Sequence, residues 1–218
     1  MDNVDYTLDE LRISLAPSIA EGAVFDGWGD QALEDAARAN GVDPAVARLA
    51  YPRGAIDMID AWIVSIDEAM AQALPQSVLA AMPIRERIRA LVQFRLDAVL
   101  GEEEAVRRAL AILAMPKHIR RSLRTGWHSA DVMWRLAGDT ATDYNHYTKR
   151  TLLAGIYSAT LGVFIDDESE GKAETRDFLA RRIEGVMRFE KAKAKWLGSS
   201  GEHFSMVRFL GRLRYPAR

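Results

Sequence analysis

Apolar positions recur at helical spacing along almost the whole chain. Leu8, Leu11, Leu15 and Ile19 follow this spacing and predict a first helix from the start of the chain. Glycine or proline marks most of the places where such a stripe stops. No segment alternates apolar and polar residues well enough to be a strand, so the pattern predicts an all-α fold. Further helices are expected over residues 31–40, 44–50, 54–74, 84–100, 102–115, 118–137, 175–196 and 202–215. In the helix over residues 54–74, one apolar stripe has Trp62 beside it and comprises Ile56, Ile59, Ile63, Ile66 and Met70.

The most informative stretch is Trp134 to Ile165. A loop over residues 139–145, rich in Asp, Thr and aromatic side chains, is followed by residues 151–165, which carry no charge. Fifteen helical residues span about 22 Å, and crossing a bilayer core takes roughly 20 residues. We therefore expect a buried central helix in a helical protein that does not span a membrane. An interior able to hold an apolar molecule and a surface able to hold a partner would fit this combination.

Two short predicted helices near the N-terminus are separated by a tight turn. We expect Asp30 to cap the first and Gly41 to end it, while Asp43 and Pro44 start the second. Preceded by a longer helix, this arrangement resembles a helix-turn-helix head. The predicted organisation is a helix-turn-helix-like head, a helical domain whose apolar interior could hold a lipid, and a tethered amphipathic helix, over residues 1–53, 54–197 and 198–218.

The charge is unevenly distributed, although the net charge is only −2. Residues 1–80 contain 14 Asp and Glu but only 4 Arg. A helix-turn-helix gains most of its affinity from cations that contact phosphates. The two short helices and their surroundings offer only Arg38, Arg48 and Arg53. We therefore expect a degenerate helix-turn-helix that binds no nucleic acid.

The predicted last helix is amphipathic and follows a Gly-Ser-Ser-Gly tether. Residues 181–218 carry 10 Lys and Arg against 3 Glu. A tethered helix with an apolar face and flanking Arg can lie in the interface of an anionic membrane. The alternative is that the helix packs on the domain or on a second subunit. The candidate membrane residues are Phe204, Val207, Arg208, Phe209, Leu210, Arg212 and Leu213.

No motif for catalysis occurs in the sequence. There is no Cys, and the four His form no pair at metal-binding spacing. Asp139, Asp143 and His146 are close together, but capping and surface hydrogen bonds explain them better than a metal site. We expect a binding protein and not an enzyme, with no metal and no cofactor. The N-terminus lacks the pattern of a signal peptide, which predicts a cytoplasmic protein.

One combination of residues resembles a known family. It comprises Asp131-Val-Met-Trp, Ala137-Gly-Asp, Thr142-Asp-Tyr-Asn-His-Tyr-Thr-Lys-Arg, Leu153-Ala and Ile156-Tyr. This combination is similar to the ubiquinone (coenzyme Q) biosynthesis accessory proteins, lipid-binding proteins that assist the demethoxyubiquinone hydroxylase. The resemblance implies a fold like that of TetR regulators and a homodimer that binds isoprenoid quinone intermediates. It also implies that the protein presents them to the hydroxylase at a membrane, which it contacts through its C-terminal helix. The sequence shows no mitochondrial targeting extension, so we expect a bacterial protein at the inner membrane.

Carried over residue by residue, the resemblance implies a patch that binds the hydroxylase. At His146 the eukaryotic members carry Trp, a residue favoured as an interface anchor, so the sequence departs from the eukaryotic pattern there. The patch comprises Asp131, Met133, Trp134, Asp143, Asn145, His146, Tyr147 and Arg150.

Apolar residues of the predicted helices are candidate walls for a lipid pocket. The alternative for each of them is an ordinary position in the core. The candidates are Leu91, Phe94, Leu110, Leu113, Trp127, Leu152, Ile156 and Leu161. Two other functions stay open: a TetR-type transcription regulator with a lipid ligand, against which the acidic head argues, and a helical enzyme, against which the scattered titratable residues argue.

Overall fold

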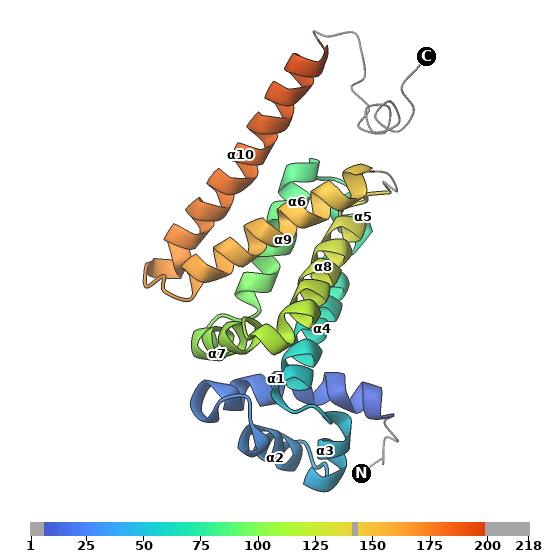
Figure 1. Cartoon of the computed structure of the whole chain (residues 1–218), viewed down its shortest axis with the longest axis vertical. Coiled ribbons are helices and arrows are strands. Elements are labelled where there is room, and N and C mark those ends of the chain that lie inside the picture. The colour runs from blue at the N-terminus through green and yellow to red at the C-terminus, as the bar shows by residue number, and fades with distance from the viewer. Residues whose placement is uncertain (1–6, 141–143, 199–218) are drawn as a thin grey trace, which may run out of the picture. The chain divides into compact units, whose positions relative to one another are not determined.

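The structure, a computed structural model, describes residues 7–140 and 144–198, and describes the backbone alone at residues 144, 145, 187 and 189–198. Within these residues every regular element is a helix, so the predicted all-α fold is confirmed (Figure 1). The candidate membrane residues Phe204, Val207, Arg208, Phe209, Leu210, Arg212 and Leu213 lie outside the described residues. The elements are α1 (Leu8–Asp26), α2 (Asp30–Ala39), α3 (Pro44–Ala50), α4 (Ala55–Ala73), α5 (Gln76–Leu79), α6 (Ile84–Asp97), α7 (Glu103–Leu113), η1 (Pro116–His118), α8 (Ile119–Leu136), α9 (Tyr144–Phe164), η2 (Glu170–Lys172) and α10 (Ala173–Gly198).

The three helices of the head form one end of the bundle, where α1 packs against α2, α3 and α4 (Figure 1). Asp43 caps α3 as predicted, because its carboxylate accepts a hydrogen bond of 2.8 Å from the amide of Ala45. The predicted cap at Asp30 is wrong by one position. Gly29 occupies the cap without a side-chain hydrogen bond, and Asp30 is the first residue of α2, where its charge still favours the helix dipole.

The predicted apolar stripe of α4 is buried in the bundle except at Ile63, which is partly exposed. At its head end, the ring of Trp28 lies 5.1 Å from that of Trp62, measured between centroids. The indole nitrogen of Trp28 also donates a hydrogen bond of 3.0 Å to the carbonyl of Ala105. The turn between α1 and α2 is thereby fixed to both α4 and α7. The chain divides into two compact units, one up to Leu179 and one from Ala180. The division into three domains stays a prediction.

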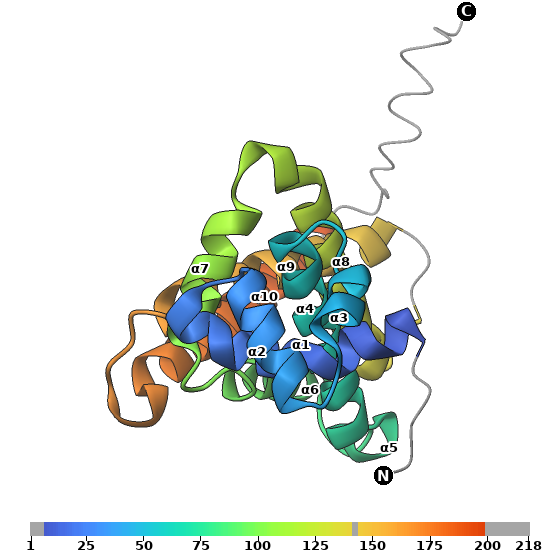
Figure 2. The same ribbon diagram turned by 90° about the horizontal axis from the view of Figure 1, so that it is seen from below.

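α7 and α8 form a hairpin whose tip stands out from the other helices of the bundle, while α8 packs against α4, α6 and α9 (Figure 2). Arg121 ties the start of α8 to α4, because its guanidinium contacts Asp60 and lies 2.7 Å from Asp57. Thr125, one turn later, donates a hydrogen bond of 3.0 Å to Asp60. The inner side of α8 is thus anchored by polar contacts, and its opposite side is left to face outward.

The uncharged run does not form a fully buried helix in the single chain, so the prediction of a buried central helix is wrong. α9 begins at Tyr144, inside the predicted loop, and buries Leu153, Thr160 and Phe164. Its other side is exposed, and a Cβ added at Gly155 or Gly162 would meet no atom within 4 Å. Many residues of the run are Thr, Gly, Ser or Ala, and these small side chains do not require burial as Leu or Ile do. Absence of charge is therefore a weaker signal of burial than an apolar stripe.

Glu102, at the start of α7, makes folding dependent on pH. Burial raises its pKa to about 7, with further contributions from Glu21 and Glu103, and one carboxylate oxygen is buried without a hydrogen-bond partner. The folded state therefore binds more protons than the unfolded state between about pH 4.5 and 7, and stability falls as pH rises through that window. We expect Glu102→Gln to raise the free energy of unfolding at pH 8 by about 1–2 kcal/mol, with little effect at pH 5, in urea titrations. An equal gain at both pH values would contradict this assignment.

Candidate functional site

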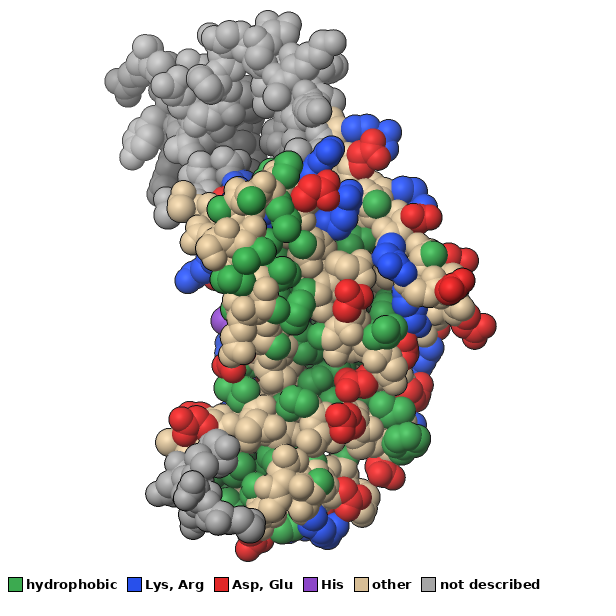
Figure 3. Space-filling view, turned by 180° about the vertical axis from the view of Figure 1, so that it is seen from behind, with side chains coloured by type: hydrophobic (Ala, Val, Ile, Leu, Met, Phe, Trp, Pro, Cys, Tyr) green, Lys and Arg blue, Asp and Glu red, His purple; other side chains and the backbone are tan. Residues whose placement is uncertain are grey.

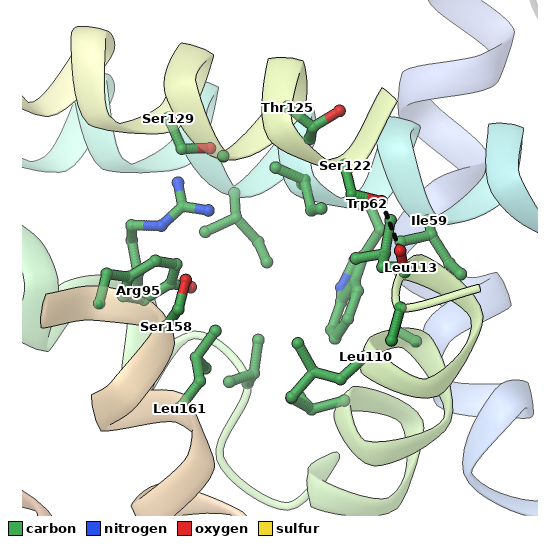
Figure 4. A pocket seen from close by; sticks show the side chains of 18 of the residues that line it. Ile59, Trp62, Arg95, Leu110, Leu113, Ser122, Thr125, Ser129, Ser158 and Leu161 are labelled. Atoms are coloured by element: carbon green, nitrogen blue, oxygen red, sulfur yellow. Dashed lines mark hydrogen bonds between the residues drawn. The ribbon is translucent and has the colours of Figure 1, made fainter. Parts of the chain in front are cut away.

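A cavity of about 340 Å³ lies between α4, α6, α7, α8 and α9 (Figure 4). Trp62 from α4, Leu110 and Leu113 from α7 and Leu161 from α9 surround its apolar part. Cavities of about 300–1,000 Å³ are typical of sites for small molecules, and most are lined by apolar side chains. The remaining lining residues are Ile59, Ile63, Ile66, Arg95, Val99, Val106, Ala109, Ala114, Ser122, Leu123, Thr125, Gly126, Ser129, Tyr157 and Ser158.

Arg95 gives the cavity one strongly polar side. Its buried guanidinium forms an ion pair with Asp67, and Ser129 donates a hydrogen bond of 3.0 Å to the same carboxylate. The ring of Tyr157 lies 4.9 Å from the guanidinium. Burial raises the pKa of Asp67, although the charge of Arg95 and the hydroxyl of Ser129 act in the opposite direction. The Nε of Arg95 is buried and has no hydrogen-bond partner. An acceptor atom on a ligand would satisfy this nitrogen, which would otherwise cost about 1–3 kcal/mol.

The cavity opens beside the hairpin of α7 and α8. Ala114, Leu123, Gly126 and Ser158 line it and are also exposed to solvent. Arg95 lies on one side of the cavity, near Ser129 and Ser158, and Leu110 and Leu113 lie on the other (Figure 4). The cavity is thus amphipathic, and it suits a ligand that has an apolar part and at least one hydrogen-bond acceptor.

Three of the eight predicted pocket residues, Leu110, Leu113 and Leu161, line the cavity. The other five are not among its lining residues. Leu91 is fully buried in the packed core, and Leu152 is 39% exposed on α9. Phe94, Trp127 and Ile156 are partly buried. The sequence did not predict the polar side of the cavity, which Arg95 and Ser129 form. It predicted Ile59, Ile63 and Ile66 as part of a helix stripe with Trp62 beside it, without linking them to a pocket.

The predicted partner patch separates into exposed and buried residues. Tyr147 is 61% exposed, and its ring lies 5.2 Å from His146 and 5.8 Å from Trp127 between centroids. These three rings, which we call the aromatic cluster, lie where α8 and α9 meet. Asp143 lies outside the described residues, as does the side chain of Asn145. Whether these residues bind a partner stays a prediction.

Two other residues of the predicted patch, Asp131 and Arg150, belong to a partly buried network of charges between α8 and α9. Arg150 is 2% exposed and lies 2.5 Å from Asp131 and 3.1 Å from Asp139. Lys149 forms a second ion pair with Asp139 at 2.6 Å. Burial alone would raise the pKa of Asp139, but hydrogen bonds and charges from Lys149 and Arg150 lower it below its usual value. The network therefore supports the surface that carries the aromatic cluster.

Two further residues of the predicted patch strengthen this support. The indole of Trp134 donates a hydrogen bond of 3.0 Å to the carbonyl of Lys149, and the Nζ of Lys149 lies 5.3 Å from the centroid of the same ring. Met133 is fully buried. The side chain of Met133 therefore cannot reach a partner while the domain stays folded.

The described residues contain no group of three or more acidic or histidine side chains placed to hold a metal ion. Over the same part of the chain, no helix is both long and apolar enough to cross a membrane.

The cations of the head are neutralised by neighbouring acids. Arg38 forms ion pairs with Glu34 and Asp35 at 2.7 Å, and Arg48 contacts Glu34 as well. Arg53 lies 2.9 Å from the buried Asp57. Acidic side chains also predominate over the head end of the face in Figure 3. Phosphates would have to compete with carboxylates that already occupy these guanidinium groups.

Fold and site together define a helical protein with a regulator-like head and an amphipathic cavity in its body. The solved structure of the TetR transcriptional regulator from Nitrosomonas europaea is similar to this chain with a TM-score of 0.62 and 23% identity, over 79% of this chain and 95% of that one. This likeness confirms the TetR-like fold.

A family model described as COQ9 matches residues 119–190. The human ubiquinone biosynthesis protein COQ9, mitochondrial, is 29% identical over 206 residues, which cover 91% of this chain and 64% of that protein. The protein of the same name from Rattus norvegicus is 32% identical and is covered to 65%. The chain is therefore similar to COQ9 proteins over most of its own length, as the sequence indicated, and it spans just under two thirds of the length of these relatives.

Proposed function

We propose that the protein is a non-catalytic accessory factor of ubiquinone biosynthesis. In this proposal it binds isoprenoid quinone intermediates and presents them to the membrane-associated demethoxyubiquinone hydroxylase. The observation that carries the proposal is the amphipathic cavity, found in a chain related to proteins named for ubiquinone biosynthesis. A quinone or phenol ring supplies oxygen acceptors for Arg95, and an isoprenoid tail supplies apolar surface for the opposite walls.

The size of the cavity limits how much of such a ligand it holds. An apolar cavity of about 150 Å³ accommodates benzene, so 340 Å³ fits a substituted ring and a short part of the tail. Each CH₂ moved from lipid to water costs about 0.8 kcal/mol. The remainder of a long tail is therefore expected to stay in the bilayer. The protein would act at the membrane surface by lifting the ring while the tail remains anchored.

The aromatic cluster of Trp127, His146 and Tyr147 is the proposed contact for the hydroxylase. Tyr is enriched at the centres of protein interfaces because it buries a large area at low entropic cost. The buried network of Arg150 holds the two helices that carry the cluster in a fixed relation. A rigid support of this kind reduces the ordering cost of binding.

We also propose that the protein is a homodimer that uses the exposed side of α9. This side carries Leu152, Gly155, Ala159 and Gly162, so a second helix can approach its backbone closely. The C-terminal helix is the proposed anchor to the membrane, because its sequence combines an apolar face with arginines. The proposed location is the cytoplasmic side of a bacterial inner membrane.

Deletion of the gene is expected to lower ubiquinone and to cause the demethoxy intermediate to accumulate. The physical reason is that the hydroxylase loses the protein that brings the ring out of the bilayer. The measurement is liquid chromatography of quinones from the deletion strain, with the strain complemented by the intact gene as the control. Unchanged quinones together with altered transcripts of neighbouring genes would instead support a TetR-type regulator, a role that the paired arginines of the head disfavour.

A further inference from the structure

The tip of the hairpin between α7 and α8 exposes apolar side chains in a row. Met115, Ile119 and Leu123 are 41%, 46% and 70% exposed. Residues 119 and 123 are four apart on α8, so they lie on the same face of the helix. Single exposed apolar residues are ordinary, but a contiguous group on a projecting element marks an interaction surface.

Unpaired cations accompany this row. Lys117, Arg120 and Arg124 are exposed, and none of them forms an ion pair with another residue of the described chain. Arg121, between them in sequence, behaves differently because it is bound to the acids of α4. The sequence contains no Asp or Glu from residue 105 to residue 130. The hairpin tip, defined as Met115, Lys117, Ile119, Arg120, Leu123 and Arg124, is therefore apolar and positive in a chain that is slightly negative as a whole.

The hairpin tip lies at the opening of the cavity. Leu123 belongs to the tip and also lines the cavity, and Gly126 and Ala114 continue the same edge. The two helices project from the bundle at this point (Figure 2). Whatever covers the hairpin tip would therefore also control what reaches the cavity.

We propose that the hairpin tip inserts into the head-group region of an anionic lipid bilayer. Apolar side chains flanked by Lys and Arg are the combination that binds membrane interfaces, where each cation near anionic lipid strengthens binding. The unpaired cations favour an anionic surface over a neutral one. An apolar molecule then passes from the bilayer into the cavity without crossing water. This surface is separate from the C-terminal helix, and the inference does not require that the ligand is a quinone.

The absence of Cys from the sequence makes the depth of insertion directly measurable. The full chain with Leu123→Cys is labelled with an environment-sensitive fluorophore and mixed with quinone-free vesicles of phosphatidylcholine and phosphatidylglycerol. We expect a blue shift and quenching by lipids brominated in their acyl chains. The matched control is Leu49→Cys, because Leu49 is 64% exposed on α3 of the head. This control is expected to show neither change.

A second variant tests the role of charge. With Arg120→Gln and Arg124→Gln together, we expect that about ten times more lipid is needed for half of the response of the label at position 123. Arg38→Gln with Arg48→Gln changes the net charge equally on the head and is expected to leave it unchanged. A label at position 123 that stays in water while the protein sediments with vesicles would overturn the inference. So would a label that responds to purified hydroxylase and not to vesicles, because this result assigns the hairpin tip to a protein partner.

Discussion

Replacing Arg150 by leucine is expected to lower the free energy of unfolding by about 3 kcal/mol. The substitution leaves the carboxylates of Asp131 and Asp139 without the guanidinium that lies 2.5 Å and 3.1 Å from them. Removing one partner of a buried ion pair costs about 3–5 kcal/mol, since the remaining charge stays out of water. The lower end applies here because Asp139 keeps Lys149 and Asp131 keeps Arg135. Urea denaturation at pH 7 measures the change.

The matched control is Arg135→Leu, because Arg135 forms an ion pair with the same Asp131 but is 72% exposed. We expect this control to cost less than 1 kcal/mol, as exposed pairs do. The lowered pKa of Asp139 sets the sign of the pH dependence. The ion pairs of Asp139 stabilise the fold above its unfolded-state pKa near 3.8, and this stabilisation is lost as pH falls through its lower pKa in the folded state. The free energies of unfolding of the two variants should therefore converge at acidic pH. Equal costs for both variants at pH 7 would show that the network does not hold α8 to α9.

Most of the fold could be predicted from the sequence because its helices have clear stripes and clear ends. The stripe of Ile56, Ile59 and Met70 is buried as expected, and Asp43 with Pro44 starts a helix where the local chemistry requires one. α9 was predicted less well. Its small residues occur both in buried and in exposed positions, so the sequence could not show which side of α9 packs against the bundle.

The cavity was harder to predict because a pocket wall and a core position use the same residue types. Leu113 lines the cavity and Leu91 packs in the core, and nothing in their local sequence distinguishes them. A charged residue within an apolar stripe was the usable signal. Arg95 follows Ile88 and Leu91 on the buried side of α6, and Asp67 lies beside Ile66 on α4. Because a buried charge needs a partner, two opposite charges on buried faces are expected to form an ion pair. This ion pair marks the polar side of the cavity.

The family resemblance drew attention to the region where α8 and α9 meet but could not assign the role of each residue in it. Asp131 and Arg150 were carried over as partner contacts, and the structure places them in an internal ion pair. Residues can characterise a family because they hold its fold or because they touch its partner. Burial distinguishes the two, and the burial of Arg150 became apparent only in the structure.

Reducing the cavity with larger side chains is expected to abolish lipid binding while the domain stays folded. In the double variant Leu113→Trp with Leu161→Phe, aromatic rings occupy the apolar space between α7 and α9 (Figure 4). Because both residues line an existing cavity, the added atoms have room, and overpacking should cost no more than about 1–3 kcal/mol. We expect at least a tenfold loss of co-purified lipid, measured by native mass spectrometry and by lipid extraction.

The control for the filled cavity is Leu49→Trp with Leu100→Phe, which adds the same rings at positions that are 64% and 58% exposed. Lipid content should be unchanged in this control, which separates occupancy of the cavity from a general effect of added aromatic surface. The strain that carries the filled cavity is also expected to accumulate the demethoxy intermediate, because a protein that cannot admit the ring cannot present it. Full lipid content in the filled variant would place the lipid elsewhere on the protein. If the filled variant loses lipid but quinone levels stay normal, the cavity is a lipid site, but its proposed role in presenting the ring is wrong.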